Sequence, residues 1–347
     1  MVWTSARALA VLALPTALLL SPSCLAADRV KVGVINTIGD INVFIAAEKG
    51  YFAKENIEAE ILSFDASARM MAPLGAGDID IGGGSTSVAL FNAIDRKIGL
   101  RIVADKGRTA DGYVYQSLLI RKELVDSGKF KGLKDLKGLR ISVGAPGVGP
   151  LSIINEAARI GGITYGDIEK VYLPFAQQVA GMRNGAIDGA IVNEPFKTLL
   201  MSEGLAVEFV PTQEIFPDYQ VSMLQYGDRF MKERPNVAKR FMKAFLRASR
   251  DYNDAIENGR WRKDGGAEDV IGIFSKRANQ PADLIRRITP QASDPDGKVA
   301  VQSIAKDLKF FQDQGDVENK SLKAADCIDM TFAEAAVREL GPYARKR

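Results

Sequence analysis

Residue types that perform catalysis are scarce in this sequence of 347 residues. It contains no histidine and two cysteines, Cys24 and Cys327. Ser-His and Cys-His nucleophile pairs, histidine metal ligands and Cys-x-x-Cys redox or zinc sites are therefore excluded. Asp78, Asp80 and Asp188 stand at the starts of predicted strands, where we expect structural roles in turns. We predict a protein that is not an enzyme and uses no metal and no cofactor.

A glycine-rich turn over residues 144–149 invites comparison with phosphate-binding loops. It matches neither the loop that ends in Gly-Lys-Ser nor the GxGxxG pattern, because Pro146 and Val148 interrupt the spacing. We therefore expect no nucleotide site there.

The better candidates for binding are the places where a predicted strand ends and a helix begins. There are four: residues 37–40, 84–86, 145–149 and 193–194. Such helix starts present free backbone N–H groups and a positive dipole end, which favours anionic or strongly polar ligand groups. Ser85 or Thr86 is also the expected N-cap of its helix.

Aromatic and amide side chains near these helix starts complete the predicted site. Tyr113, Phe175 and Phe196 are candidates for a stacking wall, and Gln178 is a candidate hydrogen-bond donor. The full set of predicted ligand-binding residues is Thr37, Ile38, Gly39, Asp40, Gly84, Ser85, Thr86, Tyr113, Gly147, Phe175, Gln178, Asn193, Glu194 and Phe196.

The elements that must position these residues alternate short apolar runs with helix-length segments. This pattern predicts an α/β fold with largely parallel sheets. Val32-Gly33-Val34 resembles Ile141-Ser142-Val143, and residues 74–82 resemble residues 182–190 at almost the same offset. We interpret this as one plan used twice, giving two lobes that face a cleft where strands end. From Pro235 onward the pattern is mainly helical.

The first 27 residues read as a secretory signal peptide. Arg7 precedes an apolar stretch too short to span a bilayer, and small residues follow at the expected cleavage site. The alternatives are an uncleaved anchor and a lipoprotein modified at Cys24. The sequence has 46 basic and 43 acidic residues, so the charge predicts neither nucleic-acid nor membrane binding.

Several segments together resemble one family. Residues 45–57, residues 74–80, Asp135-Leu136-Lys137-Gly138-Leu139-Arg140 and Asn193-Glu194-Pro195-Phe196 resemble the binding proteins of ABC importers for nitrate, sulfonates, taurine and thiamine pyrimidine precursors. The resemblance implies a two-lobed periplasmic binding protein fold of the type II kind, with hinge strands near Gln116–Ile120 and Val221–Gln225. Residues 28–117 and 222–347 would form the first lobe with its C-terminal helices, and residues 118–221 the second.

The resemblance implies a monomeric, periplasmic protein that delivers a small molecule to a membrane permease and its ATPase. From the predicted site we expect a small organic anion, a sulfonate or a carboxylate. One alternative is a thiamine pyrimidine precursor, for which Asp40 and Glu194 would be acceptors. Another is a ligand-sensing domain of a signalling system. A pyrimidine-precursor synthase is disfavoured, because the resemblance implies a histidine and a cysteine-rich iron motif that this sequence lacks.

Overall fold

Two five-stranded sheets organise the computed structural model, which describes residues 1, 3 and 26–345. The first sheet has the order β2-β1-β3-β10-β4 and the second β7-β6-β8-β5-β9. The strands of the first sheet are β1 (Asp28–Val34), β2 (Ile57–Ser63), β3 (Ile81–Gly84), β4 (Arg101–Gly107) and β10 (Ser222–Tyr226). Those of the second are β5 (Gln116–Arg121), β6 (Arg140–Val143), β7 (Glu169–Tyr172), β8 (Gly189–Asn193) and β9 (Ala206–Pro211).

The predicted duplication is confirmed by the topology of the two sheets. In the first, β1 runs parallel to β2 and β3, while β10 is antiparallel to β3 and β4. In the second, β6 takes the place of β1 and β5 that of β10, with the same directions. The repeated glycines Gly77 and Gly185 have φ of 79° and 74° and end equivalent helices. Only glycine adopts this left-handed conformation without a steric cost, which explains the repeated residue.

Two of the aspartates set aside as structural occupy equivalent positions in the repeat. The carboxylate of Asp80 accepts a hydrogen bond from the backbone N–H of Lys31 at 2.9 Å, and that of Asp188 accepts one from Arg140 N–H at 3.1 Å. Each carboxylate therefore joins the start of one strand to its parallel neighbour. Arg140 also forms an ion pair with Asp188 at 2.9 Å, and this pairing holds the pKa of Asp188 below its usual range.

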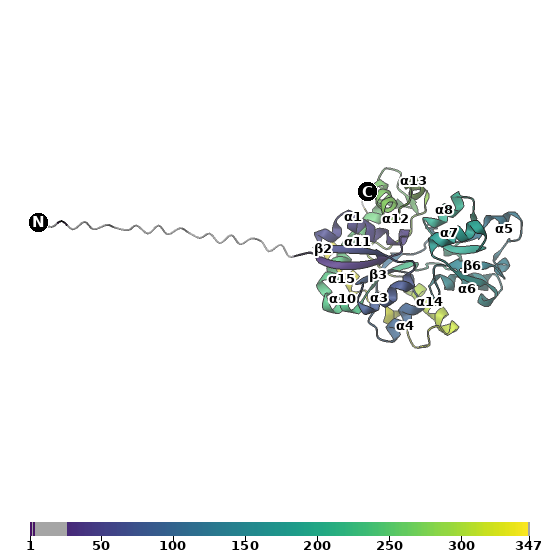
Figure 1. Ribbon diagram of the computed structural model, residues 1–347, viewed down its shortest axis with the longest axis horizontal. Coiled ribbons are helices and arrows are strands. Elements are labelled where there is room, and N and C mark those ends of the chain that lie inside the picture. Colours follow the sequence, from purple (N-terminus) through teal and green to yellow (C-terminus); the bar gives the residue numbers. More distant parts are fainter. Residues whose placement is uncertain (2, 4–25, 346–347) are drawn as a thin grey trace.

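Helices cover both sheets, and the C-terminal segment is mainly helical as predicted (Figure 1). The helices associated with the first sheet are α1 (Ile41–Glu48), α2 (Tyr51–Lys54), α3 (Met71–Ala76), α4 (Val88–Asp95), α10 (Asp228–Glu233), α11 (Pro235–Asp254), α12 (Glu268–Ala278), α13 (Ala282–Arg287), α14 (Val301–Gln314) and α15 (Thr331–Leu340). The helices between β5 and β10 are α5 (Lys122–Asp126), α6 (Pro150–Ile160), α7 (Phe175–Asn184), α8 (Phe196–Ser202) and α9 (Thr212–Ile215). A short hairpin joins β11 (Ile256–Glu257) to β12 (Arg260–Trp261).

Helix α11 packs against other helices of the first lobe. Its apolar residues recur at helical spacing, and Val237, Phe241, Phe245 and Tyr252 are buried. This face packs against α1, α2 and α15. Burying an aromatic side chain stabilises the fold by about 1.5–3 kcal/mol, so α11 anchors the layer of helices behind the first sheet.

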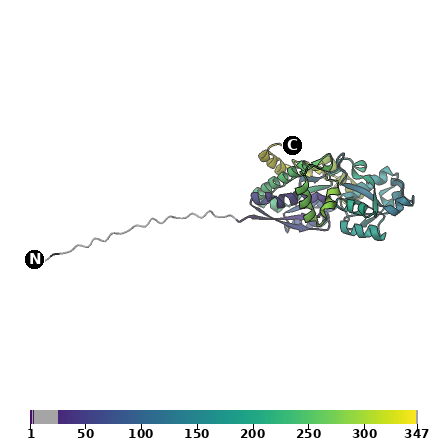
Figure 2. The same ribbon diagram turned by 90° about the horizontal axis from the view of Figure 1, so that it is seen from above.

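The chain passes between the sheets twice, over residues 108–115 and 212–221. Figures 1 and 2 show the two lobes side by side along the long axis. The segments expected to be hinge strands, Gln116–Ile120 and Val221–Gln225, lie largely in β5 and β10, directly after these crossings. We keep the lobe boundaries at residues 117 and 221 as a proposal.

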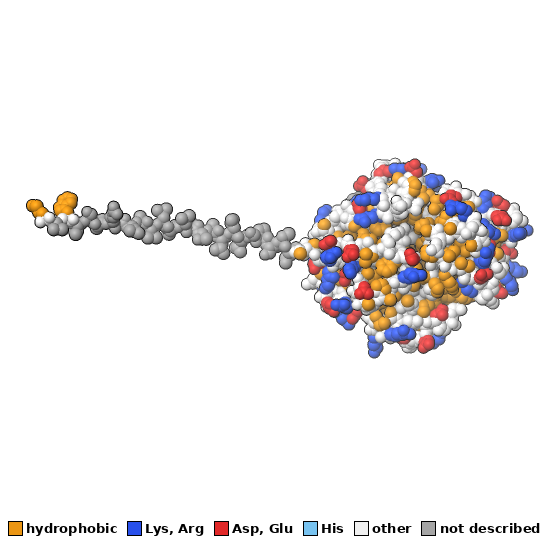
Figure 3. All heavy atoms as spheres, in the orientation of Figure 1, with side chains coloured by type: hydrophobic (Ala, Val, Ile, Leu, Met, Phe, Trp, Pro, Cys, Tyr) orange, Lys and Arg blue, Asp and Glu red, His pale blue; other side chains and the backbone are white. Residues whose placement is uncertain are grey.

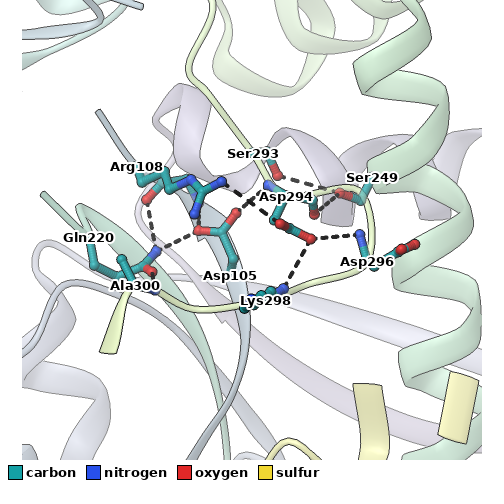
Figure 4. A network of polar contacts seen from close by, with 10 residues as sticks. Asp105, Arg108, Gln220, Ser249, Ser293, Asp294, Asp296, Lys298 and Ala300 are labelled. Atoms are coloured by element: carbon teal, nitrogen blue, oxygen red, sulfur yellow. Dashed lines mark hydrogen bonds and ion pairs between the residues drawn. The ribbon is translucent and has the colours of Figure 1, made fainter. Parts of the chain in front are cut away.

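A buried carboxylate ties both crossings together (Figure 4). Asp105, near the end of β4, is fully buried and accepts hydrogen bonds from the Gln220 side-chain amide and from Asp294 N–H. Gln220 in turn accepts a hydrogen bond from Ala300 N–H at 2.6 Å, and Arg108 lies 3.8 Å from the Asp294 carboxylate. Burial raises the pKa of Asp105 to about 6. Both crossings are therefore connected to one buried polar cluster at the edge of the first lobe.

Charges of both signs are interspersed over the face of the molecule in Figure 3, in keeping with the balanced composition. Among the described residues, no helix is long and apolar enough to cross a membrane. The predicted signal peptide, with Cys24, lies mostly outside the described residues.

Candidate functional site

A cavity lies between the two lobes, at the ends of strands from both sheets. Its volume is about 40 Å³. One water molecule needs roughly 10–15 Å³ by the same measure, so the space holds only a few water-sized groups. It is lined by Ile35, Thr37, Asp65, Ala66, Ser67, Gly84, Ser85, Gln116, Gly144, Val148, Pro150, Phe175, Ile191, Asn193, Val221 and Ser222.

The first lobe contributes hydroxyl groups to this cavity. Thr37 follows β1, Ser67 begins the short helix before α3, and Ser85 follows β3. Ser222, the first residue of β10, adds a fourth hydroxyl. The side-chain oxygens of Ser67 and Ser85 lie 3.1 Å apart and share a hydrogen bond. Hydroxyl groups both donate and accept hydrogen bonds, so this wall can take an anionic or a neutral polar group.

The second lobe contributes an amide pair and apolar surface. Gln116 and Asn193 are register partners on β5 and β8, and the Gln116 amide N–H donates to the Asn193 amide oxygen at 2.7 Å. Phe175, the first residue of α7, lines the cavity beside Ile191. Phe196 stacks on Phe175 with ring centroids 5.6 Å apart and an interplanar angle of 14°. Phe196 therefore supports the aromatic wall from behind.

The lobes are in contact around the cavity through backbone hydrogen bonds. Val88 N–H donates to the Gly147 carbonyl at 2.9 Å, and Gly149 N–H donates to the Thr86 carbonyl at 2.9 Å. Ile38 N–H donates to the carbonyl of Glu194 at 3.3 Å. The glycine-rich turn before α6 thus lies against the start of α4, and the structure corresponds to a closed arrangement of the lobes.

A buried carboxylate reinforces this closure. Asp307 of α14 is fully buried and accepts hydrogen bonds from the hydroxyl of Thr86 in the first lobe and from that of Ser152 in the second. Desolvation raises the pKa of Asp307 to about 7. We call Asp307, Thr86 and Ser152 the interlobe latch.

Five predicted residues line the cavity, namely Thr37, Gly84, Ser85, Phe175 and Asn193. The structure places the other nine outside its wall, although several touch residues that form it. These nine are Ile38, Gly39, Asp40, Thr86, Tyr113, Gly147, Gln178, Glu194 and Phe196.

The two predicted acidic residues have partners within the protein. Asp40 is fully buried and pairs with the buried Lys106 at 2.5 Å. Its other oxygen accepts hydrogen bonds from Ile35 N–H and Thr37 N–H, so Asp40 holds the loop that forms part of the cavity wall. The Glu194 carboxylate accepts hydrogen bonds from Thr198, and burial raises its pKa.

Two further predicted residues, Gln178 and Tyr113, form hydrogen bonds within the protein. The Gln178 amide N–H donates to the Leu173 carbonyl at 3.0 Å. Tyr113 is partly exposed in a turn of the first crossing, where its N–H donates to the Ala110 carbonyl. The expected N-cap at Ser85 or Thr86 was wrong, because Ser87 caps α4 by accepting a hydrogen bond from Leu90 N–H at 3.1 Å.

Sequence reasoning missed several lining residues, above all Gln116, Ser67 and Ser222. Gln116 opens β5, whose other polar residues are Ser117 and Arg121, and Ser222 opens β10. Both belong to strands that run antiparallel to their neighbours. Their first residues therefore lie beside the carboxyl ends of the parallel strands. The expected hinge strands could have indicated this, because the first residue of each such strand lies at the cleft.

The cavity wall carries no basic side chain among the described residues, and its only charged residue is the exposed Asp65. The described residues also include no cluster of three or more metal-ligating side chains. Lys106 runs beneath Gly83, but its ammonium group is paired with Asp40. Recognition in the cavity therefore rests on hydroxyls, amides and backbone groups.

Two α/β lobes of this topology around a cleft define a type II periplasmic binding protein fold, as predicted. The chain belongs to the NMT1-like family, whose model matches residues 26–260. It is 24% identical over 313 residues to the nitrate/nitrite binding protein NrtA of Nostoc sp., covering 84% of this chain and 68% of that protein.

Solved structures share the fold. The periplasmic aliphatic sulphonate binding protein SsuA from Escherichia coli matches with a TM-score of 0.66 and 18% identity, covering 88% of this chain and 92% of that one. The desulfurization enzyme DSZB matches with a TM-score of 0.59 and 14% identity, over 90% of this chain and 99% of the enzyme. The fold therefore serves binding proteins and at least one enzyme, and the site must decide between these functions.

Proposed function

We propose that this protein is the extracytoplasmic solute-binding subunit of an ABC importer, which captures a small organic anion between its lobes and delivers it to a permease. Membership of the NMT1-like family and the similarity to nitrate/nitrite and sulphonate binding proteins support the binding role. The observation that carries the proposal is the cavity itself, because both lobes contribute to its wall and close over it. Such a site gains full contact with a ligand only in the closed state.

The chemistry of the wall supports an anion held by neutral donors. Four hydroxyls of the first lobe line the cavity, and α6 and α7 of the second lobe begin at Pro150 and Phe175, which also line it. At α6 no free N–H results, because Pro150 has none and the N–H groups of Leu151 and Ser152 donate to the carbonyls of Val148 and Gly149. Of these two helix starts, it is therefore that of α7 whose first N–H groups can favour negative charge. Phe175 and Ile191 would hold an apolar part, which favours an organic sulfonate or carboxylate.

The wall also supports the proposal that the protein is not an enzyme. The sequence has no histidine, and Cys327, the one cysteine among the described residues, is buried and does not line the cavity. Burial raises its pKa to about 12, so the reactive thiolate is disfavoured. We therefore expect the ligand to be bound and released unaltered.

The alternative ligand, a pyrimidine precursor, would need acidic acceptors in the cavity. Asp40 and Glu194 were the candidates, and both carboxylates are occupied by internal partners outside the wall. Neither of these two residues therefore supports a pyrimidine, and Asp65 is the one carboxylate among the described lining residues that could accept from it.

Charge changes at two positions separate these ligands. Thermal-shift screening of sulfonates and carboxylates should first find a compound that raises the melting temperature, because it binds only the folded state. Calorimetry should then show that Ser85→Asp abolishes its binding through repulsion in a partly dehydrated cavity, whereas Glu194→Gln leaves binding nearly unchanged. Loss of binding in Glu194→Gln with retention in Ser85→Asp would support the pyrimidine instead.

A further inference from the structure

One buried side-chain oxygen, on a residue that lines the cavity, has no hydrogen-bond partner among the described residues. Gln116 is 1% exposed, and its side-chain amide oxygen forms no hydrogen bond. Its amide N–H is used, because it donates to the Asn193 amide oxygen at 2.7 Å. Both residues line the cavity. A buried polar atom without a partner costs about 1–3 kcal/mol, so it needs an explanation.

The inference holds for the orientation that the two amides have in the structure. In it the Gln116 amide N–H donates to Asn193, and the buried Gln116 oxygen is left over and can only accept a hydrogen bond. With both amides rotated by 180°, Asn193 would donate to Gln116, and the buried group without a partner would be the Gln116 amide N–H, which calls for an acceptor on the ligand.

We propose that Gln116, paired with Asn193, is a specificity-determining residue that selects ligands carrying an N–H or O–H donor in addition to their anionic group. The inference rests on the proposed function. The hydroxyls at Thr37, Ser67, Ser85 and Ser222 take the anionic end on the first lobe, and the amide pair accepts the donor on the second. A ligand of this kind bridges the lobes, and amino- or hydroxy-substituted sulfonates and carboxylates fit this description.

The same geometry predicts rejection of anions that lack a donor. Nitrate, acetate or an unsubstituted alkanesulfonate would close the cavity over an amide oxygen that has lost its access to water. A site built to hydrogen-bond a ligand group discriminates strongly against analogues that lack the group, for the same reason. The exposed Asp65 on the cavity wall adds a second acceptor and no competing cation.

Matched pairs of probes test this inference by calorimetry. The first pair is 2-hydroxyethanesulfonate and ethanesulfonate, and the second is hydroxyacetate and acetate. In the wild-type protein we expect the hydroxylated member of at least one pair to bind about 10-fold more tightly or better. Gln116→Leu should reduce that ratio to within about 3-fold. Gln312→Leu is the matched control, since Gln312 is a buried glutamine on α14 outside the cavity wall, and it should keep the wild-type ratio.

The possible results separate the inference from the proposed function. If both members of each binding pair bind equally, or if the preference survives in Gln116→Leu, the inference is overturned and the proposed function stands. If no sulfonate or carboxylate of the thermal-shift screen binds, the proposed ligand class fails and the inference falls with it. If Gln116→Leu does not fold, the wild-type ratio alone still decides, because it needs no variant.

Discussion

The interlobe latch predicts a pH dependence that one substitution should remove. Asp307 has a pKa of about 7 in the folded protein, against about 3.9 for an unperturbed aspartate. Because the folded pKa is the higher one, the folded state binds the proton more tightly. The stabilisation from this proton is fully present below pH 4 and is lost as the pH rises through 7. The difference of about 3 pH units corresponds to about 4 kcal/mol.

Urea denaturation at pH 4.5 and pH 8 measures this effect. Asp307 alone should lower the free energy of unfolding by about 3 kcal/mol between these two values, and Asp307→Asn should remove that part of the dependence. Asp105 contributes in the same direction and is unchanged in the variant. Asp313→Asn, an exposed aspartate on the same helix that pairs with Lys309, is the matched control and should behave as the wild type. Parallel pH profiles for wild type and Asp307→Asn would show that Asp307 does not cause this pH dependence.

Three further predictions concern a tightly packed glycine, a buried ion pair and the chemical fate of the ligand. In Gly149→Ala the added Cβ would lie 2.5 Å from the Thr86 hydroxyl oxygen. The melting temperature should therefore fall by an amount equivalent to about 1–3 kcal/mol. Gly144→Ala is the control and should change the melting temperature little, because the space at its Cβ is open. Asp40→Asn leaves the Lys106 ammonium buried without a counter-ion and should cost about 3–5 kcal/mol in urea denaturation, and Lys106→Met in the same chain should recover part of that loss. Mass spectrometry after prolonged incubation should return the bound ligand chemically unchanged, and conversion of more than one equivalent would contradict the binding role.

The fold could be predicted because its signals are local and repeated. Apolar runs followed by helical periodicity mark most of the parallel strands and their helices, and the repeated Gly77 and Gly185 mark equivalent helix ends, whereas β9 and the β11–β12 hairpin were not predicted. Helix α6 (Pro150–Ile160) begins directly after the glycine-rich turn at residues 144–149, where the sequence predicts a helix start. Where adjacent residues compete for one role the sequence was ambiguous, as at Ser85, Thr86 and Ser87, because any of the three can cap a helix.

The site was only partly predictable, for reasons of distance along the chain. Helix starts after strands correctly pointed to the region of the cavity, since topology brings strand ends together. The latch could not be foreseen, because Thr86 and Asp307 are 221 residues apart and their contact depends on how α14 packs. Nor could the sequence show that Lys106 would form an ion pair with Asp40, or that Gln116 would be the register partner of Asn193 on the neighbouring strand. Those facts decide which polar groups remain free for a ligand.

We expect the two lobes to move together and enclose the ligand. Small-angle scattering of the purified protein, with and without a saturating ligand found by thermal shift, measures this closure. Full contact with the cavity requires closure, so we predict a smaller radius of gyration in the saturated sample, matching the closed arrangement described above. An unchanged radius of gyration at saturation would contradict the account.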